Sequence, residues 1–117
     1  MISGIDLNQT IDYTCKGDTE NPTVWKLGVI PSYVLGQLSA KAAQSDQIEM
    51  AYKLLQMSIK GWVNFNVEYK TIKETLFGRE LDIVPLDIVE QIPLAVINEL
   101  SAKILEINGL STVERKN

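Results

Sequence analysis

The chain has 117 residues, 45% hydrophobic and 22% charged, a balance that is typical of a globular protein and argues against a disordered one. Eleven basic and 15 acidic residues give a net charge of −4, and the lysines are scattered, so we expect no nucleic-acid surface. The length predicts one domain, residues 1–110, followed by a mobile polar tail at 111–117.

Two strands are expected in the first quarter of the chain. Apolar and polar residues alternate roughly from Ile5 to Cys15 and again from Thr23 to Ile30, which is the pattern of half-buried strands. The polar segment 16–22 predicts the turn of an antiparallel pair, and Gly28 indicates a bulge or a close backbone approach. The residues expected on the buried faces are Ile11, Tyr13 and Cys15, then Trp25, Leu27 and Val29.

Two helices are expected next. Pro31 precedes the first, which runs from Tyr33 to about Ala43. The second begins after Asp46, which can cap its N-terminus in the pattern of a capping box, and ends near Gly61. Its predicted apolar stripe contains Ile48, Ala51, Tyr52, Leu55, Ile59 and Trp62.

The second half of the chain gives strand and helix signals in turn. Alternation predicts a strand from Val63 to Tyr69, Thr71–Phe77 reads as strand or turn, and Arg79–Val84 reads as a short strand. A short helix from Leu86 to Ile92 and a long one from Pro93 to about Asn108 follow. The core-facing seam of the long helix contains Ile97, Leu100, Ile104 and Ile107. Together the elements predict an α+β domain with a hairpin or small sheet packed against about three helices.

The sequence offers little for chemistry. Histidine is absent, which removes the commonest general base and zinc ligand. The single Cys15 cannot form an internal disulfide, and we expect it to be unpaired and buried. Asp82, Asp87 and Glu90 could hold a cation or act as an acid/base pair, but the start of a helix explains Asp87 without either role. We therefore expect no catalytic residue, no cofactor and no metal site.

The aromatic residues are the better lead. Tryptophan buries a large area, so Trp25 and Trp62 are expected in the core. The alternative makes Trp25 or Phe65 an anchor on a contact surface. Asn21-Pro22 is expected to form a shaped turn that launches the next strand with Trp25 facing inward. The helix residues expected against Trp25 are Tyr52, Leu55 and Ile59. The candidate partner-binding residues are Asn21, Pro22, Trp25 and Phe65.

Three short segments carry a resemblance. They are Asn-Pro-Thr-Val-Trp at Asn21–Trp25, Lys-Gly-Trp-Val-Asn-Phe at Lys60–Phe65, and the start of the last helix at Ile92–Leu100. In these segments the chain resembles small proteins encoded among the tail genes of tailed bacteriophages, particularly the tail assembly chaperones. The resemblance implies a small α+β domain without an active site that coats the tape measure protein, keeps its long apolar helices soluble, and helps recruit tail tube subunits.

Three classes of function stay open at this point. The first is a tail assembly chaperone, the second a minor virion protein at the head–tail connector or in the tail, and the third a host-directed inhibitor, small binding module or enzyme. The expected partners are phage tail proteins or a second copy of the chain, with no nucleic acid or membrane. The N-terminal residues lack the basic and apolar regions of a signal peptide, and no apolar run approaches the roughly 18–20 residues that cross a bilayer. The expected location is the host bacterial cytoplasm during assembly, or the virion for the second class.

Overall fold

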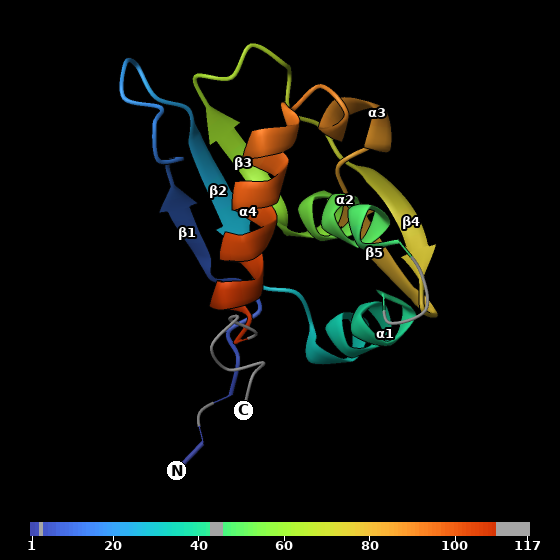
Figure 1. Cartoon of the computed structure of the whole chain (residues 1–117). Helices are drawn as coiled ribbons and strands as arrows, with labels where there is room; N and C mark the ends of the chain where they lie inside the picture. Colours follow the sequence, from blue (N-terminus) through green and yellow to red (C-terminus); the bar gives the residue numbers. More distant parts are fainter. Residues whose placement is uncertain (3, 43–45, 110–117) are drawn as a thin grey trace.

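The structure is a computed structural model of the chain, and it describes residues 1–2, 4–42 and 46–109 (Figure 1). These residues form two small antiparallel sheets and four helices, one of them a single turn, which confirms the expected α+β class. The tail expected at 111–117 and the helix end expected at Ala43 lie outside the described residues.

The elements follow the chain in a simple order. The first sheet holds β1 (Thr10–Tyr13), β2 (Val24–Gly28) and β3 (Ile59–Val63), and the second holds β4 (Ile72–Leu76) and β5 (Arg79–Ile83). The helices are α1 (Ser32–Ala42), α2 (Gln47–Ser58), α3 (Leu86–Val89) and α4 (Leu94–Ile107). Within the described ranges, no helix is long and apolar enough to cross a membrane.

Helix α2 lies between the two sheets and packs against α1, α3, α4 and β5 (Figure 1). It begins where the sequence predicts, because the Asp46 carboxylate accepts a hydrogen bond from the backbone N–H of Ile48 at 2.9 Å. Leu54 and Leu55 on its inner face are almost completely buried. Burial of each such side chain stabilises the fold by about 1.5–3 kcal/mol. The inner face of α2 therefore holds the surrounding elements together.

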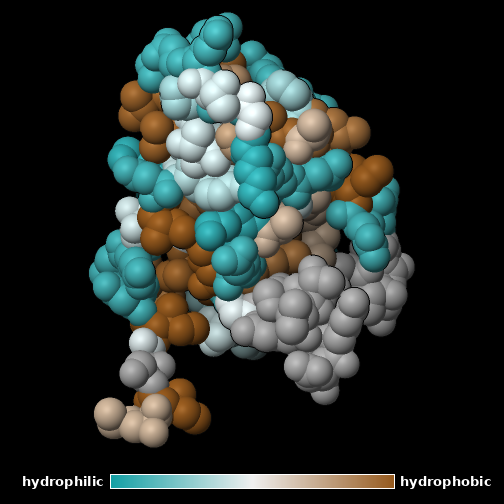
Figure 2. Space-filling view, turned by 60° about the vertical axis from the view of Figure 1, so that its left-hand side comes forward, coloured by the Kyte–Doolittle hydropathy of each residue, from teal (hydrophilic) through white to brown (hydrophobic). Residues whose placement is uncertain are grey.

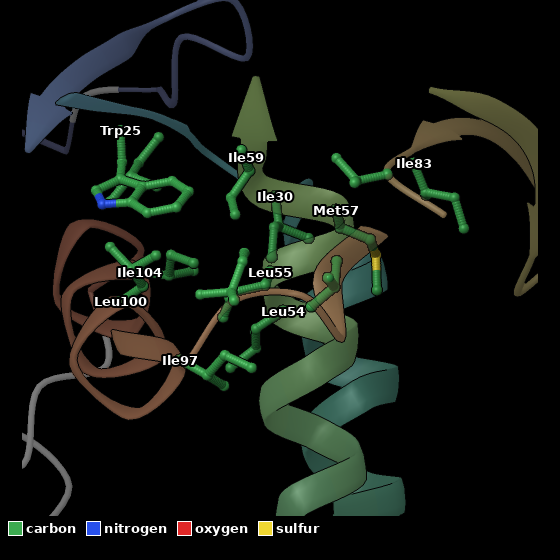
Figure 3. Close-up of a cluster of buried hydrophobic side chains, with 14 of the residues drawn as sticks. Trp25, Ile30, Leu54, Leu55, Met57, Ile59, Ile83, Ile97, Leu100 and Ile104 are labelled. Carbon is green, nitrogen blue, oxygen red and sulfur yellow. The ribbon is translucent and has the colours of Figure 1, made fainter. Parts of the chain in front are cut away.

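Helix α4 crosses one face of the three-stranded sheet (Figure 1). Ile97, Leu100 and Ile104 of its predicted seam are completely buried. Trp25, at 3% exposure, faces this helix from β2, and Figure 3 shows its ring close to Leu100 and Ile104. The predicted helix partner Leu55 belongs to the same core cluster. The main core therefore lies between the sheet, α4 and α2.

The hairpin of β1 and β2 has the expected antiparallel pairing, and β3 extends it. Trp25 lies between two cross-strand neighbours, Tyr13 on β1 and Trp62 on β3. The pairing of β2 with β3 shifts register between Lys26 and Leu27, next to the position where Gly28 predicts a bulge. A Cβ atom at Gly28 would lie 2.9 Å from Cε of Lys60, so the close approach is made by a side chain rather than by a backbone.

The predicted end of the second helix is wrong. Helix α2 stops at Ser58, and Ile59 and Trp62, which were placed on its apolar stripe, belong to β3. Pairing with β2 gives this segment partners that a longer helix would lose. Ile48, the first residue of the predicted stripe, lies in the first turn of α2 and is 59% exposed.

Three further boundaries differ from the sequence prediction. The first strand starts at Thr10 rather than Ile5, because Asp6 forms a turn in which its side chain accepts from the backbone N–H of Asn8 at 3.0 Å. The short helix α3 ends at Val89 rather than Ile92. Residues 64–71 form a loop instead of the strand expected from Val63 to Tyr69. The predicted strand at Arg79–Val84 is confirmed as β5, and the segment Thr71–Phe77 contains β4.

Candidate contact surface

Two loops meet at one end of the three-stranded sheet. The loop before β2 contains Asn21 and Pro22, and the loop after β3 begins at Asn64, next to the strand pair Val24 and Val63. The Asn64 amide donates to the Asn21 side-chain oxygen at 3.2 Å and to the carbonyl of Pro22 at 3.3 Å. In return the hydroxyl of Thr23 donates to the Asn64 carbonyl at 2.8 Å. We call Asn21, Pro22, Thr23 and Asn64 the asparagine corner.

Both asparagines of this corner have left-handed backbone conformations, with φ of 47° at Asn21 and 63° at Asn64. Asparagine tolerates this region better than most residues because its short side chain forms local hydrogen bonds. A second anchor comes from Asp18, whose carboxylate accepts from the backbone N–H of Thr23 at 2.9 Å. The corner is therefore a fixed shape that both loops build together.

Replacing Asn64 separates the backbone effect from the side-chain effect. Asn64→Ala is expected to lower the free energy of unfolding by about 1–2 kcal/mol, because it loses the amide bonds and keeps a Cβ in the left-handed region. Asn64→Gly loses the same amide bonds without that backbone strain, so a smaller loss is expected. Chemical denaturation of the two variants makes the comparison. Equal stabilities would show that the left-handed backbone contributes nothing.

Aromatic rings lie directly behind the corner. The ring of Phe65 is 5.1 Å from that of Trp25 and 5.2 Å from that of Trp62, and Tyr69 lies 5.0 Å from Trp62. The Trp62 indole N–H donates to the carbonyl of Val67 at 2.7 Å, which holds the loop against β3. The contacts of Trp62 with Phe65 and Tyr69 are edge-to-face, and such contacts favour one arrangement of the rings. The cluster is a rigid support for the corner.

All four residues predicted to bind a partner gather at this end of the sheet. Asn21 is exposed, Pro22 and Phe65 are half-buried, and Trp25 lies in the core beneath them. In this structure Trp25 supports the surface and does not form part of it. The sequence analysis did not identify Asn64, which joins the two loops through its bonds to Asn21 and Pro22. Asn64 lies next to Phe65 in the Lys-Gly-Trp-Val-Asn-Phe segment. Asn64 and Asn21 lie 43 positions apart, so no pattern in the local sequence predicts their contact.

A second polar group joins β1 to α4. The carboxylate of Glu99 accepts from the Tyr13 hydroxyl at 2.5 Å and from the backbone N–H of Lys16 at 2.8 Å. The hydrogen bond to Glu99 raises the pKa of Tyr13 to about 12, and these bonds lower the pKa of Glu99. Cys15 is free and 8% exposed, as predicted, and burial followed by the Glu99 charge raises the pKa of its thiol to about 11. This group fastens the helix to the sheet.

The Cys15 thiol is expected to react slowly. A free thiol has a pKa of about 8.5, so a pKa near 11 leaves little thiolate at pH 8. Labelling by a disulfide reagent in native buffer should therefore be far slower than labelling of the same protein in denaturant. Equal rates in the two solutions would contradict the buried position of Cys15.

A hollow of about 250 Å³ lies between the first sheet and β5. Its polar groups already have partners within the chain. The Lys60 ammonium donates to the Met57 carbonyl at 3.1 Å, and the Asp82 carboxylate pairs with Lys73 at 3.1 Å. Burial lowers the pKa of Lys60, and the charge of Asp82 opposes that shift. The remaining lining residues are Leu7, Val29, Ile30, Pro31, Glu80 and Leu81.

Asp82, Asp87 and Glu90 do not form the cation site that their sequence spacing left open. Asp82 lies on β5 beside Lys73, whereas Asp87 and Glu90 lie at α3. Within residues 1–2, 4–42 and 46–109, no group of three or more acidic or cysteine side chains could hold a metal ion.

On the side where β1 lies, the described residues expose both polar and apolar side chains (Figure 2). Figure 2 shows polar and apolar side chains interspersed there, with the N-terminal residues projecting from the body. Comparison of the chain with protein-family models, with curated proteins and with solved structures finds no match.

Proposed function

We propose that this protein works by contact in the assembly of a phage tail, as a chaperone that binds the tape measure protein and tail tube subunits in the host cytoplasm. One observation supports this proposal more than any other: the three segments that carry the resemblance form a single structural unit. Asn21–Trp25 and Lys60–Phe65 pair along β2 and β3, with Val24 opposite Val63 and Trp25 opposite Trp62. Ile92–Leu100 supplies the start of α4, whose buried face packs beneath Trp25 (Figure 3).

The exposed part of this unit is the asparagine corner with the edge of Phe65. It offers amide groups beside a partly exposed ring and a proline, so it can contact both the backbone and the apolar side chains of a partner. The corner is held by hydrogen bonds before a partner arrives, which lowers the ordering cost of binding. A patch this small also permits release, which a chaperone requires if it leaves after recruiting tail tube subunits.

Co-expression with the tape measure protein of the same phage tests the proposal. The chain should raise the soluble yield of the tape measure protein. Phe65→Ser should reduce that effect, because it removes the apolar part of the surface. Ile48→Ser is the matched control, since it removes an exposed apolar side chain at the start of α2.

The outcome is read only for variants that remain folded, as checked by circular dichroism and thermal unfolding. Asn21→Gly provides a second variant, because glycine accepts the left-handed backbone while losing the exposed amide. Either of two results would refute the proposal: no gain in soluble tape measure protein with the wild-type chain, or full activity in both folded variants.

A further inference from the structure

A basic and aromatic patch lies where the tip of the second hairpin meets α1. The guanidinium of Arg79 lies 5.1 Å from the centre of the Tyr33 ring, and the ammonium of Lys41 lies 5.5 Å from that of Phe77. Tyr33 is 52% exposed, and both cations reach the surface. Helix α1 contains no acidic residue, although the whole chain carries a net charge of −4. We call these four residues the α1 patch.

The α1 patch is held in a fixed shape. Phe77 and Gly78 form the turn between β4 and β5, with φ of 53° and 76°, a tight two-residue connection. The two cation–ring contacts fasten this turn to α1. Glu80 is the acidic neighbour of Arg79 in the sequence, and its carboxylate pairs with Lys73 at 3.7 Å. The patch therefore presents positive charge and an exposed ring together.

A patch of the opposite character lies at α3 and the start of α4. Leu86 is 49% exposed and Leu94 is 58% exposed, and the carboxylates of Asp87 and Glu90 are exposed beside them. The segment from Pro85 to Ala95 contains no lysine or arginine. We call these four residues the α3 patch. These four side chains point outward because the residues between them, Ile88, Val89 and Ile92, are buried in the core.

The two patches match each other in charge and apolar content, but they cannot meet within one molecule. Figure 1 shows α3 at one end of the domain, and α1 with the hairpin tip at the other. We propose that the α1 patch of one copy binds the α3 patch of the next copy. Arg79 then faces Asp87 and Glu90, while the Tyr33 ring covers the exposed leucines. The partner of each patch is thus a second copy of this chain.

A contact between two different patches leaves one free patch at each end of every dimer. Further copies can therefore add, and the contact produces a ring or a row of molecules rather than a closed symmetric pair. The area is small and the charges lie at the surface, so the association should be weak, in the range of about 10 µM to 1 mM. It should also weaken as salt rises, because salt screens exposed charges. This inference does not depend on binding to a tape measure protein.

Sedimentation velocity at increasing protein concentration tests the inference. The wild-type chain should show species larger than a monomer at low salt, and these should diminish at high salt. Arg79→Glu reverses charge in the α1 patch, and Asp87→Lys reverses charge in the α3 patch; each variant alone should remain monomeric. Glu20→Lys matches the charge change of Asp87→Lys at an exposed position outside both patches, so it should associate as the wild type does.

Mixing the two patch variants gives the sharpest result. Arg79→Glu keeps an intact α3 patch and Asp87→Lys keeps an intact α1 patch, so an equimolar mixture should form a 1:1 dimer that grows no further. Circular dichroism must show both variants folded, and Arg79→Ser replaces Arg79→Glu if the latter unfolds. A wild-type chain that stays monomeric to about 1 mM at low salt would overturn the inference. So would patch variants that associate like the wild type, or a mixture that stays monomeric.

Discussion

Trp25→Ala is expected to lower the free energy of unfolding by about 3–5 kcal/mol, a large share of the stability of a domain of this size. Trp25 is almost completely buried, and its ring lies 5.7 Å from Trp62 and 5.1 Å from Phe65. Figure 3 shows Leu100 and Ile104 of α4 close to the same ring. Alanine would leave a cavity at the point where the sheet, α4 and the aromatic cluster meet.

Chemical denaturation measures this loss directly. Lys26→Ala is the matched control, because Lys26 follows Trp25 on the same strand but its side chain lies on the other face and pairs with Asp12 at 3.2 Å. That exposed pair contributes at most about 1 kcal/mol. A denaturation midpoint for Trp25→Ala equal to that of Lys26→Ala would mean that the tryptophan does not hold the core together.

Leu55→Ala is expected to cost about 2–5 kcal/mol, whereas Ile48→Ser on the same helix should change stability by less than about 0.5 kcal/mol. The sequence places both residues on one apolar stripe, but Leu55 is completely buried and Ile48 is largely exposed. Leu55 lies where α2 faces α4 and the sheet (Figure 3), so its removal leaves a cavity that its neighbours cannot easily fill. Ile48 lies in the first turn of α2.

Thermal unfolding of the two variants decides whether the whole predicted stripe or only its C-terminal half faces the core. Similar losses for Leu55→Ala and Ile48→Ser would favour a stripe that is buried along its full length. That result would contradict the exposure of Ile48 at the start of α2.

The sequence pattern identified most helices and strands but misplaced the junction of α2 and β3. Ile59 and Trp62 continue the helical spacing of Leu55, so local periodicity favours a longer helix. The strand forms because Trp62 pairs with Trp25, 37 positions earlier in the chain, and no local pattern reports such a partner. The strand predicted from Val63 to Tyr69, where the structure has a loop, was wrong for a related reason. Phe65, Val67 and Tyr69 alternate like strand residues because they pack against the core from a loop.

The candidate surface was partly predictable. The aromatic residues were identified from residue type, because large rings gather in cores and contacts. At Asn21-Pro22 the structure has a bend, and Asn21 is left-handed with φ of 47° rather than in the extended conformation that a following proline favours. The link through Asn64 was not identified, since it depends on two loops meeting in space. The α1 patch was missed for the same reason: Tyr33 and Arg79 lie far apart in the sequence and meet only when the second hairpin docks on α1.

We propose that this protein assists tail assembly and then leaves the particle. Quantitative mass spectrometry of purified phage particles, compared with the lysate of infected cells, tests it most directly. We predict abundant peptides of this chain in the lysate and none above background in intact particles. A fixed number of copies per particle would contradict the chaperone proposal and identify the chain as a virion component.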